Sequence, residues 1–295
     1  MECFPAPEFR LQDVSMKHPL AYDILMTGAG GRLAGWFGGG LGAGKSELSI
    51  VTVSRGKAGD VQWRPCDPID ALPRCDTIIA LWGVTSGDPA SLEVNSTLAE
   101  TAHDMATRLG ARRVLHMSSA GVYGPGTNMT EDTALPRPVT LYGRAKLHME
   151  QRVAQLAATS PVAHCCLRLA NVVGADSLAP ALNGDQPAEL DRFPDGGSPV
   201  RSYIAPGMLA RVLAGLASLP PDRLPSVLNV AARQPVAMAD LLQAAGRYVT
   251  WRDAPPDAVQ SVTLNVNLLS QTLPQVDLVA DAPAMVSDLK RTQAA

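Results

Sequence analysis

The sequence predicts an α/β fold built on a doubly wound parallel sheet, and three observations lead to this prediction. Segments rich in β-branched residues alternate with stretches whose apolar residues recur at helical spacing. Two strand segments, IIALW (78–82) and VLHM (114–117), are almost continuously apolar, as strands covered on both faces are. A glycine-rich turn follows the first strand candidate.

Taken in order, the elements support this fold class. The helix expected at 94–111 has apolar residues at helical spacing and ends in a glycine stop signal, and a second amphipathic helix follows two prolines. Beyond residue 175 the chain is richer in loops, and its last 45 residues are weakly patterned. The expected strands are 22–28, 48–54, 76–83, 112–119, 163–174 and 228–231, and the expected helices are 94–111, 140–158, 208–219 and 236–249.

Composition excludes several classes of function. The chain of 295 residues is 46% hydrophobic and carries a net charge of −3, without a basic cluster, so neither nucleic acid nor an anionic membrane is an expected partner. Five scattered cysteines without a CxxC pair indicate reduced thiols in a cytoplasmic protein and no metal site. No apolar run approaches the length of a membrane span.

Two glycine-rich stretches compete for the role of a phosphate-binding loop. Residues 39–46 match the GxxxxGK[ST] pattern, but a helical stretch precedes them and a strand-like stretch follows, which reverses the order that such a loop requires. TGAGGRLAG (27–35) follows a strand candidate and opens a helix. There Gly28 permits a tight turn, Gly31 lets the backbone approach a pyrophosphate, and Ala34 lets helix and strand pack closely. We therefore predict that 27–35 binds a dinucleotide and that 39–46 is a connection.

Tyr142 and Lys146 are candidates for acid–base chemistry. Their spacing places both side chains on one face of a helix. A phenol has an ordinary pKa near ~10, and an ammonium group one turn away favours the phenolate and lowers that pKa. Ser118 and Ser119 end the preceding strand, at the edge where ligands bind in doubly wound sheets, so their hydroxyls could hold a substrate oxygen.

In this order and spacing, TGxxGxxA, SSxxVYG and YxxxK make the chain similar to the extended short-chain dehydrogenases/reductases, the NAD-dependent epimerase/dehydratase family. The resemblance runs from about residue 22 to 232 and implies a Rossmann-like fold with a small C-terminal substrate-binding lobe. We accordingly divide the chain into a disordered leader (1–19), an NAD(P)-binding domain (20–175) and a substrate-binding lobe interleaved with the sheet (176–295).

The resemblance also assigns roles to individual residues. It implies that Tyr142 is the acid/base, that Lys146 binds the nicotinamide ribose and depresses the tyrosine pKa, and that Ser119 positions the reacting oxygen. Asp67 is implied to meet the adenine. The residues implied to bind substrate are Ser118, Asn171 and Arg201. The residues implied to bind cofactor are Thr27, Gly28, Gly30, Gly31, Arg32, Leu33, Ser54, Arg55, Asp67, Leu81, Trp82 and Lys146.

The end of the second strand favours NADP over NAD. The segment IVTVSRG has no acidic residue to bind a ribose 2′-hydroxyl. Ser54 and Arg55 stand where a 2′-phosphate would bind, and a guanidinium suits a phosphate.

The sequence therefore predicts an NAD(P)-dependent enzyme that acts on a sugar-like or nucleotide-sugar hydroxyl or carbonyl through Ser119, Tyr142 and Lys146. Epimerisation, dehydration and simple reduction are all open alternatives. A different class of function is an NADP-binding sensor or scaffold with this fold and no turnover, and the complete Ser-Tyr-Lys set argues against it. The resemblance further implies a homodimer, because members of the family often pair through the helix that carries YxxxK.

Overall fold

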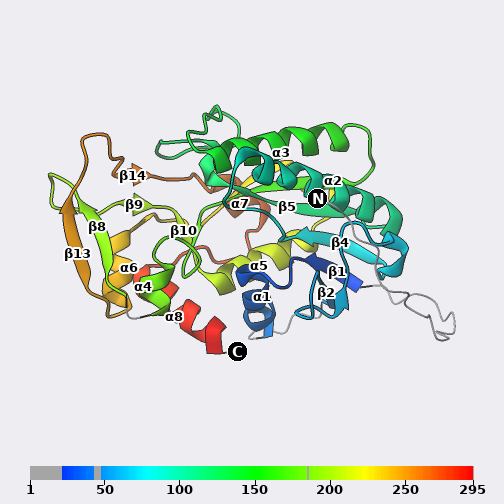
Figure 1. The fold of residues 1–295 in the computed structure, drawn as a ribbon, viewed down its shortest axis with the longest axis horizontal. Coiled ribbons are helices and arrows are strands. Elements are labelled where there is room, and N and C mark those ends of the chain that lie inside the picture. Colours follow the sequence, from blue (N-terminus) through cyan, green and yellow to red (C-terminus); the bar gives the residue numbers. More distant parts are fainter. Residues whose placement is uncertain (1–21, 43–47, 185, 295) are drawn as a thin grey trace.

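A computed structural model describes residues 22–42, 48–184 and 186–294, and its centre is a seven-stranded parallel sheet (Figure 1). The predicted doubly wound α/β fold is confirmed, since the strand order reverses between β1 and β4. In spatial order the strands are β11 (Val227–Val230), β6 (Ala163–Leu169), β5 (Arg113–Ser119), β4 (Cys75–Ala80), β1 (Tyr22–Thr27), β2 (Ile50–Ser54) and β3 (Val61–Gln62).

Helices cover both faces of this sheet (Figure 1). One face carries α2 (Pro89–Leu109) and α3 (Leu141–Ala157), and the other carries α1 (Arg32–Gly42) and α5 (Pro206–Ala217). The apolar runs of the strands make this possible, because side chains on both faces of β4 and β5 are removed from water. Short 3-10 helices lie at η1 (Ile69–Ala71), η2 (Ala120–Val122) and η3 (Pro221–Arg223).

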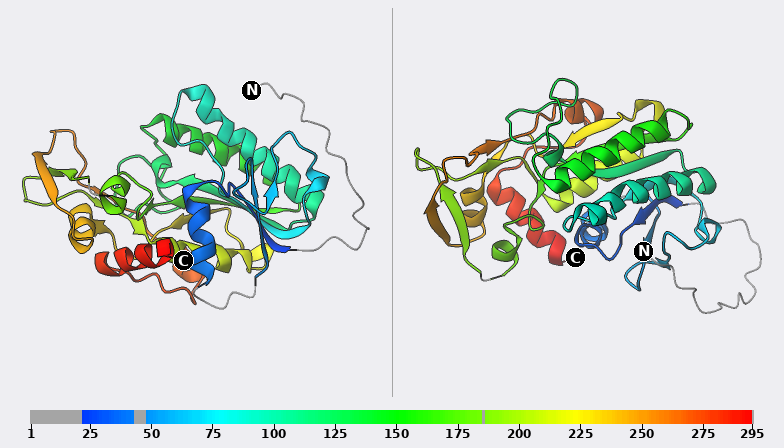
Figure 2. Two further views of the ribbon diagram at one scale, coloured as in Figure 1. Left: turned by 60° about the horizontal axis from the view of Figure 1, so that its bottom comes forward. Right: turned by 45° about the horizontal axis from the view of Figure 1, so that its top comes forward.

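Most of the remaining elements form a lobe beside the carboxyl ends of the strands, whereas the short helix α7 (Asn267–Thr272) packs against β11 (Figure 1). Helix α8 of the lobe packs against α1, α5 and α6 (Figure 2). The Asp288 carboxylate in α8 accepts a hydrogen bond of 2.7 Å from the Gly207 N–H in the first turn of α5. The elements outside the large sheet layer are β7 (Asn171–Val172), α4 (Ala179–Asn183), β8 (Ala188–Arg192), β9 (Val200–Arg201), β10 (Tyr203–Ile204), β12 (Val236–Ala237), α6 (Met238–Ala244), β13 (Val249–Asp253), β14 (Ser261–Val262), α7 (Asn267–Thr272) and α8 (Ala282–Ala294).

The helix expected at 94–111 begins earlier, at Pro89, and two other predicted elements differ in kind or extent. The strand expected at 163–174 divides at Ala170, because β6 pairs with β5 and β11 whereas β7 leaves the large sheet to pair with β10. The helix expected at 236–249 stops at Ala244, because Gly246 follows with a φ of 70° and turns the chain into β13.

Part of the competing glycine-rich stretch can be placed. Gly39 lies within α1, and β2 begins at Ile50, so a helix precedes the stretch and a strand follows it. Residues 43–47, with Lys45 and Ser46, lie outside the described residues, as does the predicted leader at 1–19.

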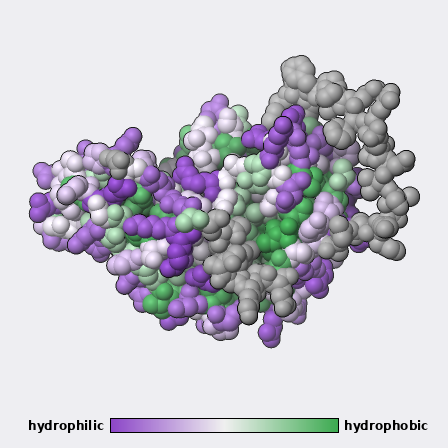
Figure 3. Space-filling view, turned by 90° about the horizontal axis from the view of Figure 1, so that it is seen from below, coloured by the Kyte–Doolittle hydropathy of each residue, from purple (hydrophilic) through white to green (hydrophobic). Residues whose placement is uncertain are grey.

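Figure 3 shows the face that carries α1 and α5, where a band of apolar residues lies on the half of the molecule that contains the large sheet. Among the described helices, none has the length and apolar character needed to cross a membrane.

Candidate active site

The glycine-rich turn lies at the carboxyl end of β1, where the strand order reverses. Gly28 has a φ of 77°, and a Cβ added there would lie 2.7 Å from the backbone nitrogen of Trp82, so that only glycine fits against the loop after β4. The Gly31 N–H donates a 2.8 Å hydrogen bond to the Gly28 carbonyl and closes the turn immediately before α1. The first N–H groups of a helix have no partner within the helix and favour an anion, so this cradle fits the diphosphate of a dinucleotide.

Other predicted cofactor residues surround the turn. Leu33 in α1 and Leu81 after β4 line one small apolar pocket, and the Arg32 guanidinium donates to the Ala175 carbonyl at 3.3 Å. Two polar atoms, the hydroxyl oxygen of Thr27 and Nε1 of Trp82, are buried without a hydrogen-bond partner in the part of the chain that the structure describes. Unpartnered polar atoms at this edge are compatible with a ligand that supplies the missing partners.

The end of β2 is arranged differently from the expectation for Ser54. Its hydroxyl donates to the Gly56 carbonyl at 2.7 Å and accepts from the Gly59 N–H at 3.1 Å, so it is committed to the turn after the strand. Arg55 is exposed. The Asp67 carboxylate accepts a 2.7 Å hydrogen bond from the Arg64 N–H and closes a turn beyond β3. Of Ser54 and Arg55, the two residues predicted to bind a 2′-phosphate, Arg55 is therefore the one whose side chain faces solvent.

Tyr142 and Lys146 lie in the first half of α3 and face the same side of it. The Lys146 side chain is 4% exposed, and its ammonium lies 5.8 Å from the centre of the Tyr142 ring. Lys146 Nζ donates to Asn95 Oδ1 at 2.9 Å, and a Cβ added to Gly83 would lie 3.4 Å from the same nitrogen. Lys146 therefore reaches the loop that follows β4.

The same loop contacts the glycine-rich turn. Trp82 abuts Gly28, and the next residue, Gly83, abuts Lys146. The turn that fits a diphosphate and the buried ammonium are therefore brought to the same crevice, at the point where ligands bind in doubly wound sheets.

Burial sets the proton affinities of both groups. It raises the pKa of Tyr142 to about 12 and lowers the pKa of Lys146 to about 8. The structure thus differs from the expectation that Lys146 lowers the tyrosine pKa, because desolvation of the phenol dominates. The Tyr142 hydroxyl makes no hydrogen bond with the described residues, which leaves it free to bind a substrate oxygen.

Of the two adjacent serines, Ser119 lies at the junction between β5 and η2. The Ser119 hydroxyl accepts from the Gly121 N–H at 3.0 Å and starts η2. Gly121 in turn packs on Gly143, the residue after Tyr142. Because η2 and the first turn of α3 are in backbone contact, Ser119 lies close to the start of the helix that carries Tyr142.

Ser118 is placed elsewhere, because successive residues of a strand face opposite sides of the sheet. Its hydroxyl donates to Glu150 at 2.5 Å, and Glu150 is paired with Arg168 at 2.8 Å; all three side chains are buried. The Arg168 guanidinium lies 4.5 Å from the centre of the Tyr123 ring. The structure therefore assigns Ser118 to a buried ion-pair cluster and does not bring it together with the other predicted substrate residues.

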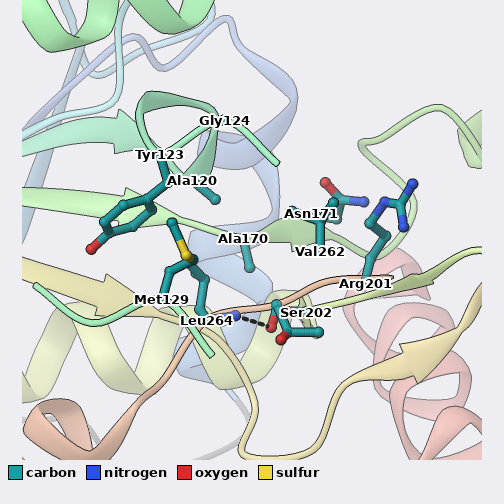
Figure 4. A pocket seen from close by; sticks show the side chains of 11 residues that line it. Ala120, Tyr123, Gly124, Met129, Ala170, Asn171, Arg201, Ser202, Val262 and Leu264 are labelled. Carbon is teal, nitrogen blue, oxygen red and sulfur yellow. Dashed lines mark hydrogen bonds between the residues drawn. The ribbon is translucent and has the colours of Figure 1, made fainter. Parts of the chain in front are cut away.

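Asn171 and Arg201 lie side by side at one end of a pocket of about 50 Å³ (Figure 4). The Arg201 guanidinium donates to the backbone carbonyls of Val200, Val259 and Gln260 at 2.7–3.0 Å, which fixes its direction. Its remaining N–H groups have no recorded partner among the described residues.

Some residues of this pocket had no signal in the sequence. Met129 and Leu264 form an isolated parallel bridge and line the pocket opposite Asn171 (Figure 4). They come from segments without a motif, so only the folded chain shows that they meet.

Comparison with known proteins agrees with this geometry. Residues 66–196 match the model of the NAD dependent epimerase/dehydratase family. Over this segment, which is less than half of the chain, the sequence is similar to that family. The resemblance inferred from the three motifs is thus confirmed.

Similar proteins are found among curated sequences and among solved structures. The chain is 28% identical over 167 residues to a dTDP-6-deoxy-L-talose 4-dehydrogenase (NAD(P)(+)) of Kitasatospora kifunensis, a match that covers 54% of this chain and half of the length of that relative. Its fold is similar to that of MoeE5 in complex with UDP-glucuronic acid and NAD (TM-score 0.73, 22% identity, 92% of this chain and 99% of the other). It is also similar to UDP-glucose 4-epimerase of Thermus thermophilus in complex with NAD (TM-score 0.72, 20% identity, 94% and 100%).

Proposed function

We propose that the protein is an NAD(P)-dependent enzyme that oxidises, reduces or epimerises a hydroxyl or carbonyl carbon of a nucleotide sugar, with Ser119, Tyr142 and Lys146 as its working side chains. The observation that carries the proposal is the loop after β4, where Trp82 abuts the glycine-rich turn and Gly83 abuts Lys146. The cofactor, when bound, accepts or donates the hydride.

Side chains of the protein itself would transfer the proton. Tyr142 exchanges a proton between its hydroxyl and the substrate oxygen, and Ser119 fixes that oxygen beside it. The pKa of about 12 favours the protonated phenol, and the positive charge of Lys146 stabilises a phenolate formed during turnover. Since the pKa of Lys146 is about 8, this ammonium is largely charged at neutral pH.

The substrate proposal rests on the pocket beside these residues. Asn171 offers an amide to sugar hydroxyls, and Arg201 offers its remaining N–H groups to a substrate phosphate. Two relatives support this class: MoeE5 was solved with UDP-glucuronic acid, and the Kitasatospora kifunensis protein acts on a dTDP-sugar by its name.

Tyr142→Phe tests the assignment. We expect cofactor affinity to stay unchanged in calorimetric titrations, while turnover of UDP-glucose, UDP-glucuronic acid or dTDP-glucose falls roughly 10²–10⁴-fold, because the acid–base group is lost. Tyr248→Phe is the matched control, since that side chain is 89% exposed and is not part of the crevice. Full turnover by Tyr142→Phe would assign the acid–base step to another residue, and a wild type that binds cofactor without turnover would indicate a binding protein.

We further propose that NADP is preferred, through Arg55. The Asp60 carboxylate near the end of β2 is taken up by the Thr52 N–H and hydroxyl at 2.9 and 2.7 Å, so it is not available to a ribose hydroxyl. Arg55→Ala should weaken NADPH binding roughly tenfold and leave NADH binding unchanged, because one charge-assisted hydrogen bond contributes about 1.5–3 kcal/mol. Arg211→Ala, an exposed arginine on α5, is the control. Stronger binding of NADH than of NADPH by the wild type would contradict this part.

We also propose that the protein forms a homodimer and works in the cytoplasm. Val139 and Leu141 are 63% and 47% exposed beside the start of α3, and a second copy could cover them. The buried thiols of Cys75, Cys165 and Cys166 are free, as in a reducing compartment. Light scattering of the purified protein at micromolar concentration should give twice the mass of one chain, and Leu141→Glu should restore the mass of one.

A further inference from the structure

Three histidines stack in a row behind the candidate active site, one from each of three elements. His103 Nδ1 on α2 lies 3.1 Å from His164 Nε2 on β6, and His164 Nδ1 lies 2.9 Å from His116 Nε2 on β5. Successive ring centres are 5.2 Å apart. His103 is half-buried, whereas His164 and His116 are 5% and 1% exposed, so the row runs from the surface of α2 into the core.

The inner end of this histidine row is next to the lysine site. His116, Trp82 and Asn95 line a cavity of about 10 Å³, which is about the size of one water molecule. The buried Nε1 of Trp82 is a donor without a partner among the described residues, and Asn95 Oδ1 accepts from Lys146 Nζ. A water in this cavity would have His116, Trp82 and Asn95 as polar neighbours.

We propose that the histidine row conducts protons between solvent at α2 and the Lys146 end of the crevice, with one water in the small cavity as the inner link. The inference rests on the proposed function, in which Tyr142 and Lys146 handle a proton. The three histidines act through that pair and do not touch the substrate.

The transfers balance along the row. In the starting state each ring carries its proton on Nε2, so that His116 donates to His164 and His164 donates to His103. A proton taken up by Nδ1 of His116 releases the one on its Nε2 to His164, which releases one to His103, which releases one to water. Every ring then carries its proton on Nδ1, one proton has left the protein, and transfer inward restores the first state.

The surroundings favour the neutral form of the two inner rings, His116 and His164. Burial, together with the charges of His164, Lys146 and His103, holds the pKa of His116 well below its ordinary value. Burial also lowers the pKa of His164 to about 4. At the outer end, the charged residues of α2 beside His103 are Asp104, which follows it in the chain, and Glu100, one turn earlier, which pairs with Arg152 of α3 at 2.5 Å.

The first test needs no substrate. In protein labelled with ¹⁵N-histidine, NMR measures how fast the ring N–H of His116 exchanges with water. Conduction predicts fast exchange in the wild type and roughly tenfold slower exchange in His103→Gln, because glutamine cannot pass a proton on. His148→Gln, an exposed histidine of α3 that pairs with Glu93, is the control and should change nothing. Equal exchange in the wild type and in His103→Gln would overturn the inference.

The second test separates the inference from the proposed function. With NAD(P) and UDP-glucose, UDP-glucuronic acid or dTDP-glucose, His103→Ala should lower kcat roughly tenfold without changing KM, and added imidazole should restore kcat in part. A structural role would give no rescue. If the wild type binds no dinucleotide, the proposed function fails, and the exchange measurement still decides for or against the histidine row. If the wild type turns over and neither exchange nor kcat responds to His103, the function stands and the row conducts nothing.

Discussion

Gly28→Ala should both destabilise the fold and weaken dinucleotide binding. A φ of 77° costs a residue with a Cβ about 1–2 kcal/mol. The added carbon would also lie 2.7 and 2.9 Å from backbone atoms of Trp82 and Leu81, and overpacking of this kind costs about 1–3 kcal/mol. We expect a loss near 3 kcal/mol, which lowers Tm by about 6 °C in a chain of this size.

Two other glycines separate the causes in the same thermal denaturation assay. Gly196 has a φ of 81° but no atom within 4 Å of an added Cβ, so Gly196→Ala should lose only the conformational part. Gly35 lies in α1 with nothing near an added Cβ, so Gly35→Ala should gain about 0.5–1 kcal/mol. In calorimetry Gly28→Ala alone should lose dinucleotide affinity, by roughly tenfold or more. Unchanged Tm and affinity in Gly28→Ala would refute the close approach of the turn to the loop after β4.

Three further variants probe the site and its support. Glu150→Gln leaves the buried Arg168 guanidinium without its counter-charge and should cost about 3–5 kcal/mol in urea denaturation. His164 in the folded chain takes up a proton only near pH 4, against 6.5 for an unperturbed ring, so folding stability should fall as the pH drops from 6.5 to 4, by up to about 3 kcal/mol, and His164→Gln should flatten this fall. Gly143→Ala places a Cβ against the Gly121 carbonyl and should push η2 from α3, so that kcat falls by about 10² while cofactor binding stays intact.

Each of these has a control or a contrary result. Glu189→Gln breaks a pair with Arg252 whose side chains are 54% and 59% exposed, and should cost less than about 1 kcal/mol. A pH profile as steep in His164→Gln as in the wild type would assign the acid transition to other groups. Normal turnover by Gly143→Ala would show that Ser119 need not be held against α3.

The parts of the site that were predictable from the sequence are local. Gly28 and Gly31 are three positions apart and Tyr142 and Lys146 are four positions apart, so turn and helix geometry fix their relation before the chain folds. Ser118 marks the limit of that reasoning. A serine pair at a strand end puts one hydroxyl on each face, and the pattern does not say which face meets the tyrosine.

The rest depends on contacts between distant segments. His103 and His164 are 61 residues apart, and His116 and His164 are 48 apart, so no spacing rule links them. Leu264 lies in a weakly patterned segment, and it lines the pocket because that segment forms a β-bridge with Met129. Such meetings are set by the packing of whole elements and not by local propensity.

Elements from beyond residue 175 complete the sheet and the helix layer of the part of the chain that precedes them. β11 supplies the strand beside β6, and Asp288 in α8 satisfies the Gly207 N–H at the start of α5, 81 residues earlier. A fragment that stopped at residue 175 would expose the edge of β6 and the faces that α5 covers, which invites aggregation. We therefore expect one cooperative unfolding transition for the protein, and slow folding dominated by long-range contacts.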